Sequence, residues 1–449
     1  HTHNLDCVRT LTDRACGAPS EMNVATVLVA ALLAPLVSIV FPELKEALTA
    51  DVLVGIDLGT TFSVVATCTR KNVTVQPIDG HEIMPSVVYF NSSVAGDSWT
   101  HADSIPPAAV SVGRAARALK DVHPRNVIYA AKRLIGLDYK HPLVQLERST
   151  LQYEVGESPE GAAVPVVDGR QIPPEEVGSW LLRRMKKAAQ DGGSVLRRLM
   201  GFKFKGVTVS VPVSFDYDQT AATIRAANKA GFSFVRLIEE PIAAAIAYGL
   251  HDHEGDRLVL VYDFGGGTLD IALLRLDPDQ GTFLVIDRSG DSHLGGEDFD
   301  TMLAQHYAAK IKKLNNASEE TMGVLQPALL QAAERAKRAL SDWEMTTVDP
   351  VLTGAEMAGL RLPDMSLSRD DLERICRPLL ERAKKPLSQA LAQMNLRPED
   401  INDVVMVGGS SRLDAVRKLV SEFFGGMKLN TEINPDTAIA IGAARSFGC

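Results

Sequence analysis

The order of strands, turns and helices predicts an α/β protein built from two homologous halves. A strand that ends in aspartate, a turn of glycine and threonine, and a second strand occur together at 52–66 and again at 260–274. At a matched distance, each copy is followed by a further apolar strand and then by a helix that begins at a proline. Repeated units of this kind indicate an internal duplication. We therefore expect two facing halves whose turns meet in one cleft.

The clearest signal for a binding site is the stretch 258–270. The run Leu258–Tyr262 is apolar or aromatic throughout, as in a buried strand, and it is followed by Asp263. The next glycines, Gly265 to Gly267, have no Cβ, so their backbone N–H groups can approach an anion such as a phosphate. Asp263 would repel the phosphate itself but can hold Mg²⁺ against it. On this segment alone, a tight glycine-rich hairpin with a capping aspartate is an equally good interpretation.

The first half contains the same arrangement, with Asp57 at the end of its strand and Gly59, Thr60 and Thr61 in its turn. Proline suits a helix start because its missing N–H has no helical partner there. The matched later elements are the strands 206–215 and 403–413, the helices 217–230 and 412–424, and the helices opened by Pro241 and Pro435.

Length and composition exclude several classes of protein. A chain of 449 residues is too long for one ordinary core and predicts at least two domains. The formal net charge of −9 argues against nucleic-acid binding. The five cysteines have no CxxC spacing, which predicts no zinc site, and no GxxxxGK[ST] motif of a classical P-loop occurs.

The N-terminal extension, 1–50, contains an almost wholly apolar run at 24–41. Its length and its central Pro35 favour a signal peptide or a loosely held membrane anchor, with a buried core helix as the alternative. Three glycosylation sequons, at Asn72, Asn91 and Asn316, are compatible with entry into the secretory pathway. We expect membrane contact only through this apolar run.

The segments between the repeated elements are predicted to be peripheral. Ser368, followed three residues later by Asp371, is a candidate N-cap. Loops are expected at 91–109 and 154–174, and helices at 175–189, 299–314, 322–340 and within 366–395.

Eight motifs identify a resemblance to a known family. In order and spacing, GIDLGTTFS, AAKRLIG, EEPIAAAIAYGL, DFGGGTLD, HLGGEDFD, ERAKRAL, VGGSSR and NPDTAIAIGAA resemble the ATPase domain of the DnaK-type 70-kilodalton heat-shock chaperones, from Val52 to the end of the sequence. The resemblance implies an actin-like ATPase fold: two ribonuclease-H-like lobes, each with a smaller subdomain, closing over a central nucleotide cleft. Lobe I would span 51–249 and lobe II 250–449. It also implies ATP or ADP with Mg²⁺ as ligands, K⁺ as an additional candidate ion, and slow ATP hydrolysis by a monomer.

The resemblance assigns catalytic roles to residues of both halves. Lys132 resembles the lysine that orients the attacking water, and Glu240 the carboxylate beside it. Asp57 and Asp263 resemble the acids that hold Mg²⁺ through water, while Thr268 and Asp270 match further residues of the site. The phosphate turns would be formed by Gly59, Thr60, Thr61 and Phe62 and by Gly265, Gly266, Gly267 and Thr268.

A second set of residues would bind the nucleoside. Glu334, Lys337 and Arg338 have the i, i+3, i+4 spacing of one helix face, so that they can reach one ligand together. Without the resemblance, a solvated helix face would be the better interpretation. The remaining residues that the resemblance places against the nucleotide are Gly295, Gly296, Glu297, Ser341, Gly408, Gly409, Ser410, Arg412 and Asp436.

The sequence also departs from the family pattern. Glu239 stands where the family usually has asparagine, Phe62 where it has tyrosine, and Thr220 where it has an arginine that relays the nucleotide state. An added carboxylate can raise a neighbouring pKa or disfavour phosphate, and threonine cannot make a cationic bidentate contact. The rate of hydrolysis and the relay are therefore both in question.

These features together predict a nucleotide-switch ATPase of the endoplasmic reticulum. The sequence stops seven residues after Gly442, where the family continues into a peptide-binding domain, so we expect that domain to be missing. This layout resembles microsome-associated members of the family, in the lumen or on the membrane, with the cytoplasm as the alternative location. Expected partners are J-domain co-chaperones and nucleotide-exchange factors. The alternatives are a nucleotide-stabilised scaffold that binds co-chaperones without useful turnover, a truncated gene model of a full-length chaperone, and, less favoured, a sugar kinase of the same architecture.

Overall fold

The computed structural model describes most of the chain from residue 52 onward, and all the described residues belong to one compact unit. The predicted extension 1–50, with its apolar run 24–41, lies outside the described residues. The described ranges are 52–69, 72–96, 104–192, 204–252, 255–277, 282–351 and 360–446.

The first large sheet contains the first of the two predicted hairpins. Its order is β12-β11-β1-β2-β3, with the short β4 paired to β2. The central strand β1 pairs antiparallel with β2 and parallel with β11. The strands are β1 (Val52–Leu58), β2 (Phe62–Thr69), β3 (Asn72–Val75), β4 (Met84–Pro85), β11 (Phe204–Val211) and β12 (Val235–Glu239).

The second large sheet repeats this arrangement, in the order β15-β14-β13-β18. Its strands are β13 (Arg257–Phe264), β14 (Leu269–Asp277), β15 (Thr282–Asp291) and β18 (Asp403–Val407). As in the first sheet, the strand that carries the aspartate pairs antiparallel with its hairpin partner and parallel with a strand from far along the chain. The predicted α/β class with two homologous halves is confirmed.

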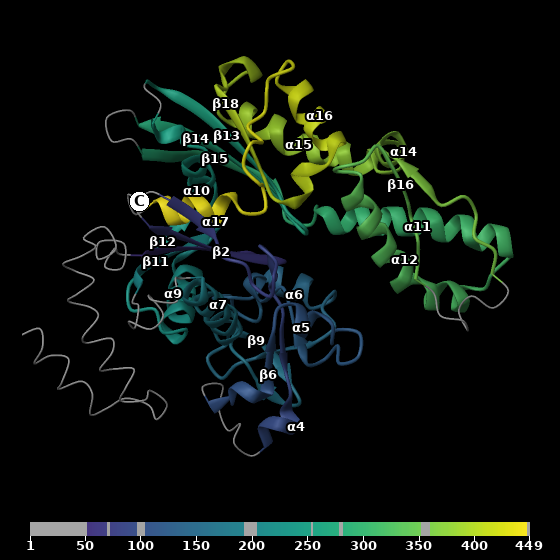
Figure 1. Ribbon diagram of the computed structural model, residues 1–449, viewed down its shortest axis with the longest axis horizontal. Helices are drawn as coiled ribbons and strands as arrows, with labels where there is room; N and C mark the ends of the chain where they lie inside the picture. The colour runs from purple at the N-terminus through teal and green to yellow at the C-terminus, as the bar shows by residue number, and fades with distance from the viewer. Residues whose placement is uncertain are drawn as a thin grey trace, which may run out of the picture. The chain divides into compact units, whose positions relative to one another are not determined.

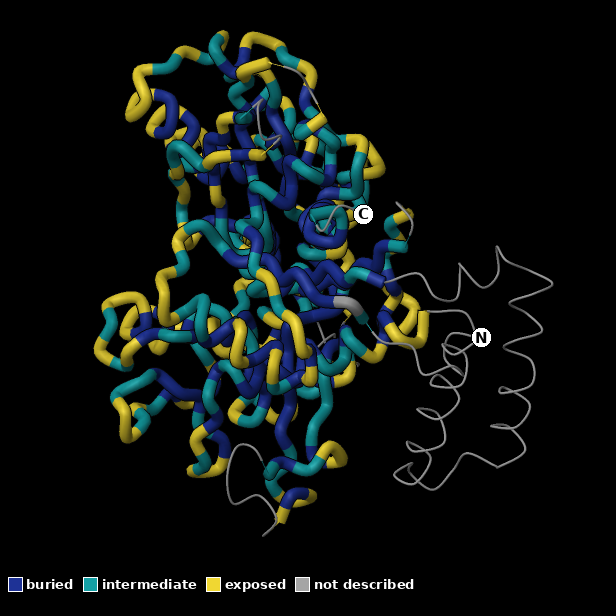
Figure 2. The backbone as a smooth tube through the Cα atoms, turned by 90° about the vertical axis from the view of Figure 1, so that its left-hand side faces the viewer, coloured by how far each residue is buried: buried dark blue, intermediate teal, exposed yellow. Residues whose placement is uncertain are grey.

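Helices cover both sheets and form the two main cores. Helices α7 (Pro174–Asp191) and α9 (Tyr217–Lys229) pack together beside the first sheet, and α7 contributes Trp180, Leu181 and Leu182 to the core that contains Val54 and Ile56. Helix α15 (Arg377–Gln393) packs on β14 and β15. Helices α11 (Gly296–Asn315) and α12 (Glu319–Ala339) pack against each other and extend the second core. In Figure 2 the buried segments lie inside and the exposed segments lie mainly in outer loops.

Two short helices connect the halves. Helix α10 (Glu240–Ala247) packs on the second sheet, while α17 (Ala438–Arg445) packs on β1 and β2 of the first, so each contacts the sheet formed mainly by the other half. They lie side by side between the two sheets (Figure 1). Their backbones touch, because a Cβ added at Gly442 would lie 1.7 Å from the carbonyl oxygen of Ala243. The two sheets lie on either side of the predicted lobe boundary at 249/250, but this helix pair crosses it.

The prediction of a loop at 154–174 was wrong. This segment forms an antiparallel sheet of β8 (Glu154–Glu157), β9 (Ala163–Val167) and β10 (Arg170–Gln171). Val155, Ala163 and Val164 are buried, so part of the segment carries the apolar side chains that stabilise strands. Its glycines and prolines, which suggested a loop, lie partly in the turns: Gly161 and Gly169 have positive φ values.

The predicted helices 175–189, 217–230, 299–314 and 322–340 are confirmed as α7, α9, α11 and α12. The segment 366–395 is divided instead into β17 (Ser366–Ser368), α14 (Arg369–Ile375) and α15, because Pro378 fits the first turn of a new helix but not the interior of a continuing one. Ser368 is the predicted N-cap: its Oγ accepts a bond of 3.0 Å from the backbone N–H of Asp371. The helix expected at 412–424 begins at Asp414 as α16 (Asp414–Phe423), after a 3-10 turn, η8 (Gly409–Arg412).

The remaining elements are short. Within 91–109, which was expected to be a loop, the described part contains one helical turn at each end, α4 and η4. Of the helices that the structure describes, none has the length and apolarity needed to cross a membrane. The other elements are α4 (Ser92–Ala95), η4 (Pro107–Ala109), β5 (Val88–Phe90), β6 (Val110–Val112), α5 (Arg114–Arg117), β7 (Val127–Ile128), η5 (Ala131–Arg133), α6 (Pro142–Glu147), η6 (Leu250–Asp252), β16 (Met345–Thr347) and η7 (Pro398–Asp400).

Candidate functional site

The two acid-terminated hairpins meet, as the duplicated pattern suggested. The β1–β2 turn contains Thr61 and the β13–β14 turn contains Gly266, and a Cβ added at Gly266 would lie 3.1 Å from the Thr61 Oγ1. Asp57 and Asp263 stand at corresponding positions near the ends of their strands, each paired across its own hairpin. The two turns and the two aspartates therefore bound one cleft between the halves.

Lys132 reaches the two aspartates from η5. Its Nζ lies 2.5 Å from the Oε1 of Glu240, the first residue of α10, and the two side chains are only 11% and 14% exposed. Burial alone would lower the pKa of Lys132, but Glu240, Asp57 and Asp263 together raise it. The lysine therefore keeps its proton at neutral pH and stays fixed among carboxylates.

The two strand-end aspartates resist ionisation in the nucleotide-free protein. Burial first, and then the charge of Glu240, raise the pKa of Asp57 to about 6, although Lys132 and a 2.8 Å bond from the Ser210 Oγ oppose the shift. The pKa of Asp263 is raised well above its ordinary value, again by burial first and then by Glu240 and other neighbouring carboxylates. For both aspartates, the nearby positive charge is too small to offset burial and the neighbouring carboxylates.

Asp270 adds a further carboxylate on the strand β14, where it pairs with Asp263. Burial of its carboxyl group and then the charge of Glu240 raise its pKa to about 6, while a bond with Thr268 and the charge of Lys132 oppose this. The residue remains exposed, so solvent screens its charge more than that of Asp57.

The cleft thus has the charge imbalance that a divalent cation would correct. Four carboxylates, those of Asp57, Glu240, Asp263 and Asp270, approach the single ammonium group of Lys132. In the described part of the chain, no three His, Cys, Asp or Glu side chains are grouped closely enough to bind a metal directly. This donor set fits an ion that keeps its water shell and takes further oxygens from phosphate, as Mg²⁺ does.

The second phosphate turn is held in place from behind by the start of α11. The backbone N–H groups of Gly296 and Glu297 donate to the carbonyls of Gly265 (3.1 Å) and Gly266 (2.8 Å), and the Ser410 Oγ donates to the Gly265 carbonyl at 2.8 Å. This approach requires Gly295, because a Cβ there would lie 2.3 Å from the Gly266 oxygen. The turn is therefore positioned before any ligand binds.

A second glycine-dependent contact lies at the end of β18. Gly408 has φ +79° and packs so closely that a Cβ would lie 2.4 Å from the carbonyl oxygen of Phe264. Beside it, a Cβ at Gly409 would lie 2.9 Å from the Oδ1 of Asp436, which forms an ion pair with Arg412 at 3.0 Å. The structure thus groups the four predicted residues Gly408, Gly409, Arg412 and Asp436 at one place.

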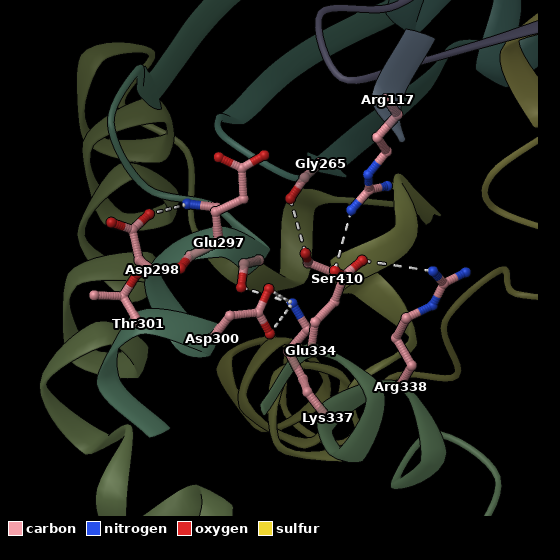
Figure 3. Close-up of polar contacts among 12 residues, drawn as sticks. Arg117, Gly265, Glu297, Asp298, Asp300, Thr301, Glu334, Lys337, Arg338 and Ser410 are labelled. Atoms are coloured by element: carbon pink, nitrogen blue, oxygen red, sulfur yellow. Dashed lines mark hydrogen bonds and ion pairs between the residues drawn. The ribbon is translucent and has the colours of Figure 1, made fainter. Parts of the chain in front are cut away.

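Of the three residues of α12 predicted to bind the nucleoside, Lys337 contacts α11. Lys337 is buried and turned toward α11, where its Nζ donates to the Gly296 carbonyl (2.6 Å) and to Asp300 (2.8 Å) (Figure 3). A charge-assisted bond to a buried carboxylate holds the ammonium group there more firmly than water would. Lys337 therefore supports the start of α11, whereas Ser341 bonds through its carbonyl to Arg369.

The other two of these α12 residues contact each other, and Glu334 also contacts Arg117. Glu334 accepts a bond of 3.2 Å from Arg117, and Arg338 lies 3.7 Å from the other carboxylate oxygen (Figure 3). Since Arg117 precedes the lobe boundary and Glu334 follows it, this pair joins the two halves. The Arg117 guanidinium also lies 5.8 Å from the ring centroid of Phe62.

Sequence reasoning missed Arg133 and Ser210. Arg133 binds Glu147 at 2.6 Å and donates to the carbonyl of Gly267 at 3.2 Å, so it ties the first half to the second phosphate turn. Its place directly after Lys132 was the available signal. Ser210 could have been found from its position near the end of β11, the strand parallel to β1.

Two of the three departures from the family pattern, Thr220 and Glu239, lie in or at the start of helices. The Thr220 Oγ1 donates to the carbonyls of Asp216 (2.9 Å) and Tyr217 (2.8 Å) within α9. Glu239 is the N-cap residue of α10; partial burial raises its pKa, and the charge of Arg288 opposes the shift.

The fold and the cleft define a class of protein: two related α/β lobes that face each other across paired phosphate turns. Comparison with known proteins agrees with this. The family model described as Hsp70 protein matches residues 53–448. The chaperone protein DnaK of Buchnera aphidicola subsp. Schizaphis graminum (strain Sg) is 34% identical over 399 residues, which cover 88% of this chain and 59% of that protein. The chain belongs to the Hsp70 family, and the expected actin-like ATPase fold is confirmed. It matches about three fifths of the length of this curated relative.

Proposed function

We propose that the protein binds Mg-ATP in this cleft and hydrolyses it slowly to ADP and phosphate. The observation that carries the proposal is the Lys132–Glu240 pair, 2.5 Å long and buried between Asp57 and Asp263. A protonated lysine held in the region where two glycine turns meet is suited to stabilise charge on a phosphoryl group. The family membership supports the same reaction.

Each residue of the cleft has a separate role in the proposed reaction. In hydrolysis, a water oxygen bonds to the γ-phosphorus while the bond to the bridging oxygen breaks; ADP leaves with that oxygen, and the proton lost by the water goes to a phosphate oxygen. Lys132, anchored by Glu240, orients that water and offsets negative charge, and it needs no change in its own protonation. Bound Mg²⁺ would neutralise the phosphate oxygens, with Asp57 and Asp263 holding its water shell. Ser210 fixes the Asp57 carboxylate for this role.

A single-turnover ATPase assay tests the proposal. Lys132→Ala should slow cleavage about 100-fold or more, the range seen when one electrostatic contact to a transition state is removed. Lys385→Ala, at an exposed site on α15 outside the cleft, is the matched control and should leave the rate unchanged. Equal rates for the wild type and Lys132→Ala would refute the catalytic role.

A second candidate function is a nucleotide-stabilised scaffold that binds co-chaperones without useful turnover. Thr220 favours it, because its hydroxyl is occupied within its own helix and carries no charge for a relay. Under this proposal J-domain proteins and nucleotide-exchange factors bind, but adding a J-domain protein does not accelerate cleavage. A clear acceleration in the single-turnover assay would instead favour the switch ATPase.

We also propose that the protein resides in the endoplasmic reticulum. The apolar run 24–41 and the three sequons support the location. In isolated microsomes the proposal predicts resistance to added protease and a mass shift on glycosidase treatment. An unglycosylated protein in the cytosolic fraction would contradict it.

A further inference from the structure

A cavity of about 420 Å³ lies beside the phosphate turns. Thr60 and Thr61 of the first turn and Gly267 of the second form one part of its wall. The cationic side chains of Arg117, Lys120 and Arg133 line another part. At about 30 Å³ per water molecule, the space corresponds to roughly fourteen waters, which is enough for a small hydrated anion.

Lys120 is the cation in this wall that no carboxylate neutralises directly. Its Nζ lies 3.8 Å from the ring centroid of Tyr129, and within the described residues it makes no hydrogen bond or ion pair. Tyr129 is itself fixed, because its hydroxyl accepts a bond from the Gln152 N–H (3.2 Å) and its carbonyl accepts one from the Tyr153 hydroxyl (2.7 Å). The ring therefore holds the ammonium group at the wall without using up its donors.

Among the side chains that line the cavity, cations outnumber carboxylates by three to two. Arg133 is paired with Glu147, and Glu297 also lines the wall. Burial is the main cause that raises the pKa of Glu297, and the charges of Lys120, Arg133 and Lys337 oppose this shift. Of the three cations, Arg117 is paired with Glu334 from outside the lining and Arg133 with Glu147 inside it, which leaves Lys120 as the cation without a direct ion pair among the described residues.

We propose that this cavity binds inorganic phosphate after it is cleaved from ATP and before it leaves the protein, with Lys120 as its main ligand. The inference rests on the proposed hydrolysis, because the cavity shares Thr60, Thr61 and Gly267 with the turns that would hold the γ-phosphate. Lys120 supplies three free donors, and the Thr61 hydroxyl supplies a fourth near the turn. Charge-assisted bonds of this type suit an oxyanion.

Equilibrium dialysis with radiolabelled inorganic phosphate tests binding without any turnover. The full chain is used with excess ADP and Mg²⁺, and compared with Lys120→Met and with Lys385→Met as the matched control. Removing the cation should raise the dissociation constant for phosphate about tenfold, since a charged hydrogen bond contributes at least that factor. Lys120→Arg should retain binding close to that of the wild type, which shows that a loss in Lys120→Met reflects charge and not misfolding. Equal phosphate affinity in the wild type and Lys120→Met would overturn the proposal.

A second measurement separates phosphate release from cleavage in a single turnover. Acid quench reports cleavage, and a fluorescent phosphate-binding protein reports release. Lys120→Met should change the release rate several-fold and leave cleavage unchanged. A parallel change in both rates would place Lys120 in the chemical step and refute the proposal. If the wild type does not hydrolyse ATP at all, the proposed function fails, whereas the dialysis result still decides whether the cavity binds phosphate.

Discussion

Single residues set the charge of the cleft, where four carboxylates converge on Lys132. Asp57 and Asp263 could be predicted because they end the strands of a repeated unit, and Lys132 and Glu240 because they lie in recognisable motifs. The burial of Lys337 could not be predicted. Its partner Asp300 is distant in sequence, and an i, i+3, i+4 spacing shows which residues share a helix face but not which neighbour covers it.

The raised pKa of Asp57 predicts how stability depends on pH. A carboxyl group whose pKa is about 6 when folded, against an ordinary value of 3.8, binds more protons in the folded state over that interval. The free energy of unfolding therefore falls as pH rises from about 4 to above 6. Asp57→Asn removes this cost, so the nucleotide-free variant should gain about 1 to 3 kcal/mol relative to wild type at pH 8.

Urea denaturation of the nucleotide-free wild type and Asp57→Asn at pH 4.5 and pH 8 checks this. The stability difference between the two proteins should grow in favour of the variant toward pH 8. A difference that is independent of pH would contradict the assigned shift.

Individual helices and strands differ in how well the sequence pattern alone predicts them. Helices with strong 3.6-residue periodicity, such as 322–340, were correctly predicted. The segment 154–174 was not, because short strands rich in glycine and proline resemble loops until the strands that pair with them are known. The helix pair α10–α17 is a third case, since its contact depends on two small-residue surfaces far apart in the sequence.

The α10–α17 contact predicts a steric effect at Gly442. Gly442→Ala places a Cβ 1.7 Å from the Ala243 carbonyl oxygen, and this backbone atom cannot rotate away. Overpacking of this kind should reduce the free energy of unfolding by about 3 kcal/mol or more. Thermal and urea unfolding measure the loss.

Gly323→Ala on α12 is the control. A Cβ at that helical glycine meets nothing within 4 Å, so alanine should be neutral or stabilise by up to about 1 kcal/mol through helix propensity. Equal effects of the two substitutions would show that α10 and α17 are not in backbone contact.

At the scale of the whole described unit, the halves are joined by α10 and α17, by the Gly266–Thr61 contact, and by the Arg117–Glu334 pair. The sequence predicted the two halves and their common cleft, because the duplicated hairpins reveal both. The position of the helices between the sheets could not be predicted. A repeat shows which parts of the two halves are equivalent, but it does not show that a helix of one half packs on the sheet of the other.

The Arg117–Glu334 pair is predicted to contribute little to stability. Its side chains are 45% and 29% exposed, so solvent screens most of the attraction. A double-mutant cycle with Arg117→Ala and Glu334→Ala should give a coupling free energy below about 1 kcal/mol. A coupling of several kcal/mol would mean that the pair is far less exposed than the structure indicates.

The most direct test of the account is a calorimetric titration of ADP into the wild type and into Asp263→Asn, each with Mg²⁺ and with EDTA. The wild type should bind Mg-ADP at least about tenfold more tightly than ADP alone, because the cation relieves the repulsion among the cleft carboxylates and the phosphates. Asp263→Asn should lose most of that difference. An affinity that is the same with and without Mg²⁺ in both proteins, or no nucleotide binding at all, would contradict the claim that the two hairpins hold a magnesium nucleotide between them.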